Sequence, residues 1–299
     1  MDTASKRVLI TGINGFTGRY MKAELESNGY EVFGLGTQPL AVPNYRQVKL
    51  VEARTLRAVL AEVQPHAIIH LAALAFVAHG DANAFYETNV IGTRNLLEAI
   101  AASGCNIECV LLASSANVYG NASEGEMSED TPPAPANDYA VSKLAMEYMA
   151  RLWMKRLPII IARPFNYTGR GQSTSFLLPK IVAHFAQKAE HIELGSLDIW
   201  RDFSDVRSVV YAYRRLLELC PAGMTVNVCS GQLYSLREIL GLCKKITGHT
   251  LTVEVNPAFV RANEVKQLYG DPTRLHSVIS DWQTPPLEET LRWMLAAYE

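Results

Sequence analysis

The chain has 299 residues, enough for one large domain or for two lobes that share a cleft. Hydrophobic residues make up 48% of it and charged residues 19%, a composition typical of a globular protein. The formal net charge of −2 gives no reason to expect binding to nucleic acid or to a membrane surface, so an anionic substrate would be held by local arginines.

The cysteines and the N-terminal residues indicate a cytoplasmic protein. Five cysteines are an odd number, and no Cys-x-x-Cys pair occurs, which favours reduced thiols over a disulfide framework or a metal site. Residues 1–7 lead directly into an expected strand and leave no room for a signal peptide. The longest charge-poor stretch, residues 67–78, is too short to span a bilayer.

The first half of the chain alternates strand and helix patterns. Short apolar runs predict strands over residues 8–11, 31–35, 47–51, 66–72, 109–113 and 158–163. Helical patterns cover residues 15–27, 56–63, 84–102 and a segment that contains Tyr139 and Lys143 and runs to residue 156. This alternation predicts an α/β protein with a doubly wound parallel sheet of the Rossmann type.

The second half is less regular and predicts a smaller domain. Residues 176–188 and 206–219 have helical patterns, and residues 225–229 are expected to add a strand to the main sheet. The remaining elements are expected over residues 236–247, 251–255 and 287–298. We expect these elements to form a smaller C-terminal α/β domain that binds substrate.

A glycine-rich turn follows the first expected strand. In Thr11-Gly12-Ile-Asn-Gly15-Phe-Thr-Gly18, the glycines allow a tight turn and a close approach of the backbone to a pyrophosphate at the helix N-terminus. The alternative is a glycine turn with no ligand. The strand before it and the helix after it favour dinucleotide binding.

The end of the second expected strand leaves the identity of the cofactor open. An acidic residue at this point binds the ribose diol of NAD, but the segment Gly34-Leu-Gly36-Thr37-Gln38 carries neither an acid nor an arginine. Thr37 and Gln38 can donate to either cofactor. The sequence therefore allows NADP(H) or NAD(H), with a slight preference for NADPH.

Ser115, Tyr139 and Lys143 are the candidate catalytic residues. Ser114 and Ser115 follow the fifth expected strand, at the sheet edge where ligands bind. Tyr139 and Lys143 are four residues apart and so share one helix face, where the cation is expected to lower the pKa of the phenol. A serine pair that only caps a strand and a Tyr/Lys pair on a surface helix are the alternatives; their order after the glycine turn favours catalysis.

These motifs together resemble the extended short-chain dehydrogenases/reductases that act on nucleotide sugars. His70-Leu-Ala-Ala73 and Asn89-Val-Ile-Gly-Thr93 also match that family, and the resemblance covers nearly the whole chain. It implies that Ser115, Tyr139 and Lys143 form the catalytic set and that Lys143 also holds the nicotinamide ribose. The residues it implies for cofactor binding are Gly12, Asn14, Gly15, Phe16, Gly18, Thr37, Leu71, Ala72, Ala73, Asn89, Tyr139, Lys143 and Arg163.

Later segments are similar to the branch of the family that acts on GDP-sugars. They are Arg163-Pro-Phe-Asn166, Arg201-Asp-Phe-Ser-Asp205, and residues 261–265 followed by Gly270-Asp-Pro. Guanidinium groups suit a diphosphate, and a carboxylate can accept from guanine N–H groups, although structural ion pairs are the alternative for each arginine. The substrate-binding residues that the resemblance implies are Asn117, Asn166, Lys180, Arg201, Arg261 and Glu264.

Departures from the family pattern narrow the expected reaction. Dehydratases of the family carry an acid beside the catalytic hydroxyl, where this chain has Ala116 and Asn117. Relatives that also epimerise use a Cys/His pair, and the matching positions here are Asn117 and Gly171. What remains is reduction of the 4-keto group of a GDP-4-keto-6-deoxyhexose. The alternatives are a 4-epimerase with tightly held NAD and a non-catalytic dinucleotide sensor.

The resemblance also implies how the chain is divided and assembled. Residues 1–165, joined by 203–229, would form the NAD(P)-binding domain, and residues 166–202 with 230–299 would bind the nucleotide sugar. The helix over 84–102 and the helix with Tyr139 would form a four-helix bundle in a homodimer. No metal, nucleic-acid or membrane partner is expected, because the seven histidines form no metal-like pair and the net charge is small.

Overall fold

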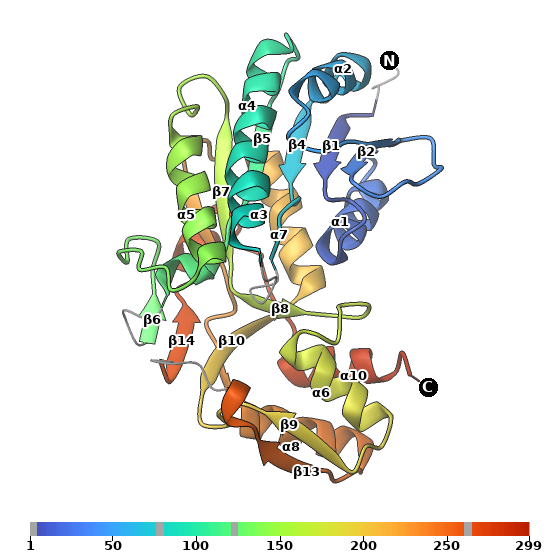
Figure 1. Cartoon of the computed structure of the whole chain (residues 1–299), viewed down its shortest axis with the longest axis vertical. Coiled ribbons are helices and arrows are strands. Elements are labelled where there is room, and N and C mark those ends of the chain that lie inside the picture. The colour runs from blue at the N-terminus through green and yellow to red at the C-terminus, as the bar shows by residue number, and fades with distance from the viewer. Residues whose placement is uncertain (1–4, 76–80, 121–124, 260–264, 299) are drawn as a thin grey trace.

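A seven-stranded parallel sheet is the centre of the computed structural model, which describes residues 5–75, 81–120, 125–259 and 265–298 (Figure 1). Its order is β11-β7-β5-β4-β1-β2-β3, so the direction of winding reverses between β1 and β4. Ligands bind at this reversal in open parallel sheets. The strands are β1 (Arg7–Thr11), β2 (Glu31–Gly36), β3 (Tyr45–Gln47), β4 (Ala67–His70), β5 (Cys109–Ala113), β7 (Ile159–Pro164) and β11 (Thr225–Val228).

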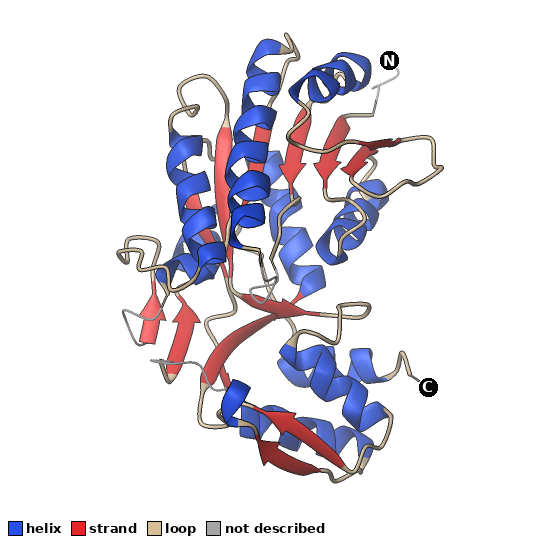
Figure 2. Cartoon of the chain, viewed as in Figure 1, coloured by secondary structure: helices blue, strands red, loops and turns tan. Residues whose placement is uncertain are grey.

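Helices cover both faces of this sheet, as the two-sided apolar strands require (Figure 2). Adjacent Ile68 and Ile69 point to opposite faces, and both are fully buried. On the face of Ile69 lie α1 (Phe16–Ser27) and α7 (Val206–Leu219), together with the short α9 (Thr273–Val278). On the face of Ile68 lie α2 (Ala53–Val63), α4 (Thr93–Ala102) and α5 (Asp138–Arg151).

The expected helix over 84–102 is broken into three parts. It consists of α3 (Ala82–Tyr86), the π-helix η1 (Glu87–Gly92) and α4. The π turn carries Asn89, whose side chain is 1% exposed and bonds to both backbone groups of Leu74. Such widened turns are common at functional sites because they redirect one side chain out of the helical repeat.

A second sheet lies below the first and was not predicted from the sequence. β10 (Trp200–Asp205) is at its centre, and buried Asp202 on that strand accepts bonds from Ser230 and Gly231. Its strands are short and come from distant parts of the chain, so each carries too little pattern to recognise. The others are β6 (Gly125–Met127), β8 (Asn166–Thr168), β12 (Leu233–Ser235) and β14 (Gln267–Gly270).

A separate apolar cluster completes the lower part of the molecule in Figure 1. It is built by α6 (Leu177–Ala186), α8 (Leu236–Thr247) and α10 (Leu287–Leu295), packed against β9 (His191–Leu194), which pairs with β13 (Thr252–Val255). A capping box of Ser235 and Glu238 begins α8, and Gly248 ends it. The short 3₁₀ helices are η2 (Ala116–Tyr119) and η3 (Pro257–Phe259).

The predicted fold class is confirmed, with shifted boundaries. β11 joins the main sheet beside β7, as expected. The third strand covers residues 45–47 and not 47–51, because the chain turns at Leu50 and Val51 before α2 begins. The helix α5 ends at Arg151 and not at 156. Among the residues that the structure describes, none of the helices is both long enough and apolar enough to cross a membrane.

Candidate active site

The glycine turn after β1 has the geometry expected of a dinucleotide site. Gly12 has φ of +73°, and a Cβ there would lie 2.8 Å from backbone atoms of Ala72. A Cβ at Gly18 would overlap the carbonyl of Gly12, so the first turn of α1 packs directly on the loop. Gly15 caps α1 without a side chain. The turn therefore fits a pyrophosphate, which would meet backbone N–H groups at the start of α1.

Exposed, uncharged residues follow β2. Thr37 and Gln38 are exposed, and their carbonyls are used by the side chains of Gln47 and Tyr45. The side chains of Thr37 and Gln38 thus extend from a loop whose backbone is fixed. Their neutral donors suit the ribose of either nicotinamide cofactor, as the sequence indicated.

The helix α5 places Tyr139, the predicted proton donor, in its first turn and Lys143 in its second. Asn137 caps this helix, because its side chain accepts a bond from the N–H of Ala140 at 2.9 Å. Lys143 donates from Nζ to the carbonyl of Ala113, the last residue of β5, at 2.7 Å. The helix and the strand end are thereby joined at the edge of the sheet where the glycine turn also lies.

Ser115 is fixed as a hydrogen-bond donor. Its Oγ accepts two bonds from Asn117, one from the backbone N–H at 3.2 Å and one from Nδ2 at 3.0 Å. A hydroxyl has two acceptor positions and one proton, so the proton of Ser115 is left to donate. Tyr139 is the neighbour toward which Ser115 acts as a donor, an effect that favours the phenolate. Burial raises the pKa of Tyr139 to about 12, and the bond with Ser115 opposes the rise.

The direction of this pKa shift differs from the sequence expectation. Lys143 was expected to lower the pKa of Tyr139, but burial of the phenol raises it, and the opposing effect comes from Ser115 and not from Lys143. Burial also lowers the pKa of Lys143 to about 8, against the opposing charge of Glu147. At neutral pH, Tyr139 is therefore a protonated phenol beside a largely protonated lysine.

Glu147 is a buried residue of this site that the sequence analysis did not single out. It accepts from Ser114 Oγ at 2.5 Å and from two nitrogens of Arg163 at 2.9 and 2.6 Å. Its spacing of four residues from Lys143 was the available signal, since it places both on one helix face. Arg163 is 2% exposed and bound internally, so its predicted contact with the cofactor stays a prediction.

Residues 71–73 and Asn89 lie beside the glycine turn. Leu71, Ala72 and Ala73 continue from β4 and are half-buried, and the N–H of Ala72 donates to Thr11 Oγ1 at 3.2 Å. Asn89 binds the backbone of Leu74 one residue further along, at 3.0 and 3.2 Å. The structure thus brings these predicted cofactor residues together at one end of the sheet.

The predicted substrate residues lie mainly on the lower sheet and on α6. Asn166 on β8 is exposed and donates to the carbonyl of Asp202 at 3.1 Å. Arg201 on β10 is half-buried and donates to the carbonyls of Trp200 and Lys266. Lys180 on α6 donates to the carbonyl of Glu193 and lies 4.9 Å from the ring of Phe259. The remaining predicted substrate residues are Asn117, which is exposed beside Ser115, and Arg261 and Glu264, which lie outside the described residues.

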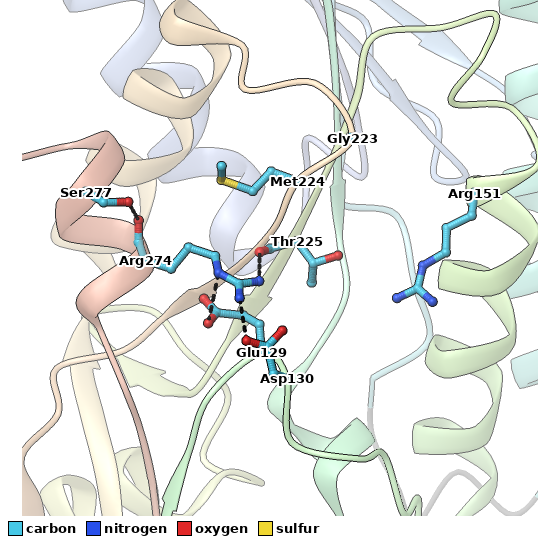
Figure 3. A pocket seen from close by; sticks show the side chains of 8 residues that line it. All are labelled: Glu129, Asp130, Arg151, Gly223, Met224, Thr225, Arg274 and Ser277. Atoms are coloured by element: carbon cyan, nitrogen blue, oxygen red, sulfur yellow. Dashed lines mark hydrogen bonds and ion pairs between the residues drawn. The ribbon is translucent and has the colours of Figure 1, made fainter.

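A cavity of about 560 Å³ opens elsewhere, and none of the predicted site residues lines it (Figure 3). Arg274 lies across it, paired with Glu129 at 3.4 Å and with Asp130 at 2.9 Å. Arg274 and Arg151 on its wall balance the charges of Glu129 and Asp130, so we assign no part of the candidate site to this cavity. Within residues 5–75, 81–120, 125–259 and 265–298, no group of three or more His, Cys, Asp or Glu residues could hold a metal ion.

Comparison with known proteins agrees with the geometry of the site. The profile of the GDP-mannose 4,6 dehydratase family matches residues 9–294. The chain belongs to this family. The resemblance to nucleotide-sugar short-chain dehydrogenases/reductases, and to their GDP-sugar branch, is thereby confirmed.

Two relatives of this chain have names that describe action on GDP-linked sugars. GDP-6-deoxy-D-talose 4-dehydrogenase of Aggregatibacter actinomycetemcomitans is 35% identical over 92% of each chain. GDP-6-deoxy-D-mannose reductase of Pseudomonas aeruginosa is 34% identical over 99% of this chain and 98% of the relative. Both are thus similar to this chain along almost its whole length.

Two solved structures share the same fold along the whole chain. One is described as a putative epimerase from Burkholderia cenocepacia, with a TM-score of 0.93, 50% identity and 98% coverage of both chains. The other is RMD from Pseudomonas aeruginosa complexed with NADPH, with a TM-score of 0.87, 33% identity and 99% coverage of both. The Rossmann-type architecture expected from the sequence is therefore that of its relatives.

Proposed function

We propose that the protein is an enzyme that uses NADPH or NADH to reduce the 4-keto group of a GDP-4-keto-6-deoxyhexose. The observation that carries this proposal is the pairing of Ser115, whose hydroxyl must donate, with Tyr139, whose pKa of about 12 keeps it protonated. Reduction of a ketone needs a proton donor at the oxygen that becomes negative. The names of the two relatives support a GDP-sugar as substrate.

In the proposed reaction, the nicotinamide cofactor supplies the hydride that bonds to C4 of the sugar. Ser115 donates a hydrogen bond to the ketone oxygen and so holds it beside Tyr139. Tyr139 transfers its phenolic proton to that oxygen, which becomes the C4 hydroxyl. The charge of Lys143 stabilises the phenolate that remains until solvent returns the proton.

The same residues support reduction over dehydration. The positions where dehydratases of the family carry an acid are Ala116, which is buried, and Asn117, whose amide is bonded to Ser115. The amide of Asn117 cannot shuttle the extra proton that elimination of water requires. Gly171 stands at the other position where an epimerising relative carries an acid-base group, and it has no side chain.

For the cofactor, we propose that the glycine turn holds the pyrophosphate and that Lys143 holds the nicotinamide ribose. The tight approach of Gly12 to Ala72 supports this, because any side chain at Gly12 would fill the turn. NADPH in the complex of the Pseudomonas relative supports NADPH, although Thr37 suits NADH as well. The proposed cofactor residues are Gly12, Asn14, Gly15, Phe16, Gly18, Thr37, Leu71, Ala72, Ala73, Asn89, Tyr139, Lys143 and Arg163.

For the substrate, we propose that the lower sheet and α6 hold the GDP part. Arg201 would bind the diphosphate, and its strand is held in place by the four hydrogen bonds that buried Asp202 accepts from Ser230, Gly231 and Gly270. The proposed substrate residues are Asn117, Asn166, Lys180, Arg201, Arg261 and Glu264. We assign residues 1–165 and 203–229 to the cofactor domain, and 166–202 and 230–299 to the substrate domain. The separate apolar cluster of the lower part supports this division, while α9 packs on the main sheet and β6 joins the lower sheet and so both cross it.

The second candidate function is that of a nucleotide-sugar 4-epimerase, which the description of the 50%-identical structure favours. Ser115, Tyr139 and Lys143 would serve it equally, since an epimerase oxidises and then reduces the same carbon. It requires cofactor that stays bound through turnover. A non-catalytic dinucleotide sensor is less well supported, because such a protein has no use for a Ser/Tyr/Lys set at the sheet edge beside the glycine turn.

We further propose a cytoplasmic homodimer assembled through α4 and α5, which lie side by side in Figure 1. The outer surface of α5 exposes Val141 and Tyr148, and Leu152 directly after the helix has 79% of its surface accessible. Ile91 of η1 is also exposed. Apolar groups exposed together mark association sites. Two copies that bury these residues against each other would form a four-helix bundle.

One assay separates the candidate functions. Purified protein is mixed with GDP-4-keto-6-deoxymannose and NADPH or NADH, the absorbance of the reduced cofactor is followed, and the product is identified by NMR. The proposal expects one cofactor oxidised per sugar reduced at C4, and the NMR spectrum assigns a rhamnose-type or talose-type product. Stoichiometric bound cofactor with interconversion of C4 epimers and no net oxidation would establish the epimerase instead.

A further inference from the structure

We propose that His70 is a positioning residue that couples the cofactor turn to the catalytic helix through a chain of buried hydrogen bonds that all run in one direction. The inference deepens the proposed reductase function and rests on it for its catalytic part. The chain of bonds begins at Thr11, directly before Gly12, and ends at the backbone of Tyr139.

His70 bridges two threonines from different elements. Its Nδ1 lies 2.7 Å from Oγ1 of Thr11 at the end of β1, and its Nε2 lies 2.8 Å from Oγ1 of Thr93 at the start of α4. All three side chains are buried. A buried imidazole with both nitrogens bonded is fixed in orientation, so it sets the distance between the strand end and the helix.

The chain continues from Thr93 to the catalytic helix. Thr93 Oγ1 donates to the carbonyl of Asn89 at 2.7 Å, and the side-chain Nδ2 of Asn89 donates to Ser142 Oγ at 2.9 Å. Ser142 Oγ donates to the carbonyl of Tyr139 at 2.7 Å. Asn89 sits in the π turn η1, which explains how one residue reaches Thr93 and Ser142 at once.

The direction of every bond follows from the carbonyl acceptors. The hydroxyl of Thr93 donates its only proton to the carbonyl of Asn89, so toward His70 it can only accept. The Nε2 atom of His70 therefore carries the hydrogen. In the neutral ring Nδ1 then accepts, and Thr11 is its donor. The N–H of Ala72 fills an acceptor position of Thr11, in agreement with this direction. The backbone of Leu74 fixes the amide of Asn89 in the same way.

Burial and the charge of Lys143 lower the pKa of His70 to about 3, so the ring stays neutral at neutral pH. A protonated ring would have to donate from Nδ1 and would displace the proton of Thr11. The series of hydrogen bonds thus has one stable arrangement. A cofactor that displaces the Gly12 turn would therefore displace Tyr139 as well. An error of about 1 Å in the position of a reacting group can cost about a hundredfold in rate.

The test compares Thr93→Val with Thr93→Ser. Valine keeps the shape of threonine and removes the hydroxyl, whereas serine keeps the hydroxyl and removes a methyl group. We expect Thr93→Val to lose about tenfold to a hundredfold in turnover at saturating substrate and about tenfold in NADPH affinity, and Thr93→Ser to stay within about threefold of the wild type. A Thr93→Val protein that is less stable, yet binds NADPH and turns over like the wild type, would overturn the proposal.

Two readouts need no sugar substrate. The ¹⁵N chemical shifts of His70 are expected to show a protonated Nε2 and an unprotonated Nδ1 at pH about 6 and about 8. NADPH affinity is measured by fluorescence. A ring protonated on Nδ1 would overturn the inference directly. If the wild type fails to reduce GDP-4-keto-6-deoxymannose, the proposed function fails, while the tautomer and the NADPH affinities of the Thr93 variants still decide the role of His70.

Discussion

The catalytic edge of the seven-stranded sheet and the lower, β10-centred region hold their polar residues in different ways. At the catalytic edge, His70, Asn89 and Lys143 are buried and bonded to the protein. In the lower region, Asn166 and Arg201 remain exposed or half-buried and bond to main-chain carbonyls. For the proposed reaction, this comparison implies that the catalytic geometry is formed before substrate binds, whereas the contacts to the nucleotide are completed by the substrate.

The largest expected effect is at the catalytic edge. Tyr139→Phe removes the proton donor and is expected to lower turnover about a thousandfold, while the variant still binds NADPH. Steady-state kinetics and cofactor fluorescence measure the two quantities. The matched control is Tyr148→Phe on the same helix, where the tyrosine is 54% exposed and no loss is expected. Near-normal turnover of Tyr139→Phe would contradict the assignment.

The next largest effect is expected in the dependence of the free energy of unfolding on pH, to which buried His70 at the catalytic edge should contribute. The unfolded chain protonates His70 near pH 6.5 but the folded chain only near 3, so the free energy of unfolding falls as pH drops through this window. We expect a loss on the order of a few kcal/mol, measured by urea denaturation at several pH values.

The control for this prediction uses two substitutions. His70→Gln removes the titrating ring and should flatten the loss of stability between pH about 6.5 and about 3. His191→Gln on β9, where the ring is exposed, should leave that loss in place. An equal pH dependence in the wild type and in His70→Gln would show that buried His70 is not its source.

Turnover should also depend on the charge of Lys143. Because burial lowers the pKa of Lys143 to about 8, the reduction is expected to slow as pH rises through that value, by about tenfold per pH unit at the higher end. In Lys143→Arg the guanidinium keeps its charge, so this limb should move to higher pH even though the overall rate is lower. A pH–rate profile that is identical in the two proteins would exclude Lys143 as the titrating group.

The smallest effect is expected in the lower region. Arg201→Ala should raise KM for the GDP-sugar about tenfold and change NADPH affinity little, because the proposal assigns Arg201 to the substrate diphosphate and not to the cofactor. Arg237→Ala is the matched control, since Arg237 lies on the same lower part, is 62% exposed and pairs with Asp198. If both variants had the same KM, Arg201 would have no part in holding the nucleotide.

The predictability of the fold differs between the same two regions. Strands such as 109–113 and helices such as 206–219 were placed correctly, because long apolar runs and amphipathic patterns record burial on a large sheet. The lower sheet was missed, because β6, β8 and β12 have three residues each and gain their stability only from partners far away in the chain. The π turn around Asn89 was not predicted either, since the sequence of these residues continues the pattern of an ordinary helix.

For the site, the sequence by itself predicted Ser115, Tyr139 and Lys143 as the catalytic residues, because these residue types suit proton transfer and follow a glycine turn in this order. It also placed the glycines, since only glycine fits a turn as tight as that at Gly12. Tertiary structure alone decided the pKa of Tyr139, the single donor direction of Ser115 and the chain through His70. Each of these depends on burial and on bonds between residues distant in sequence, which spacing along the chain does not encode.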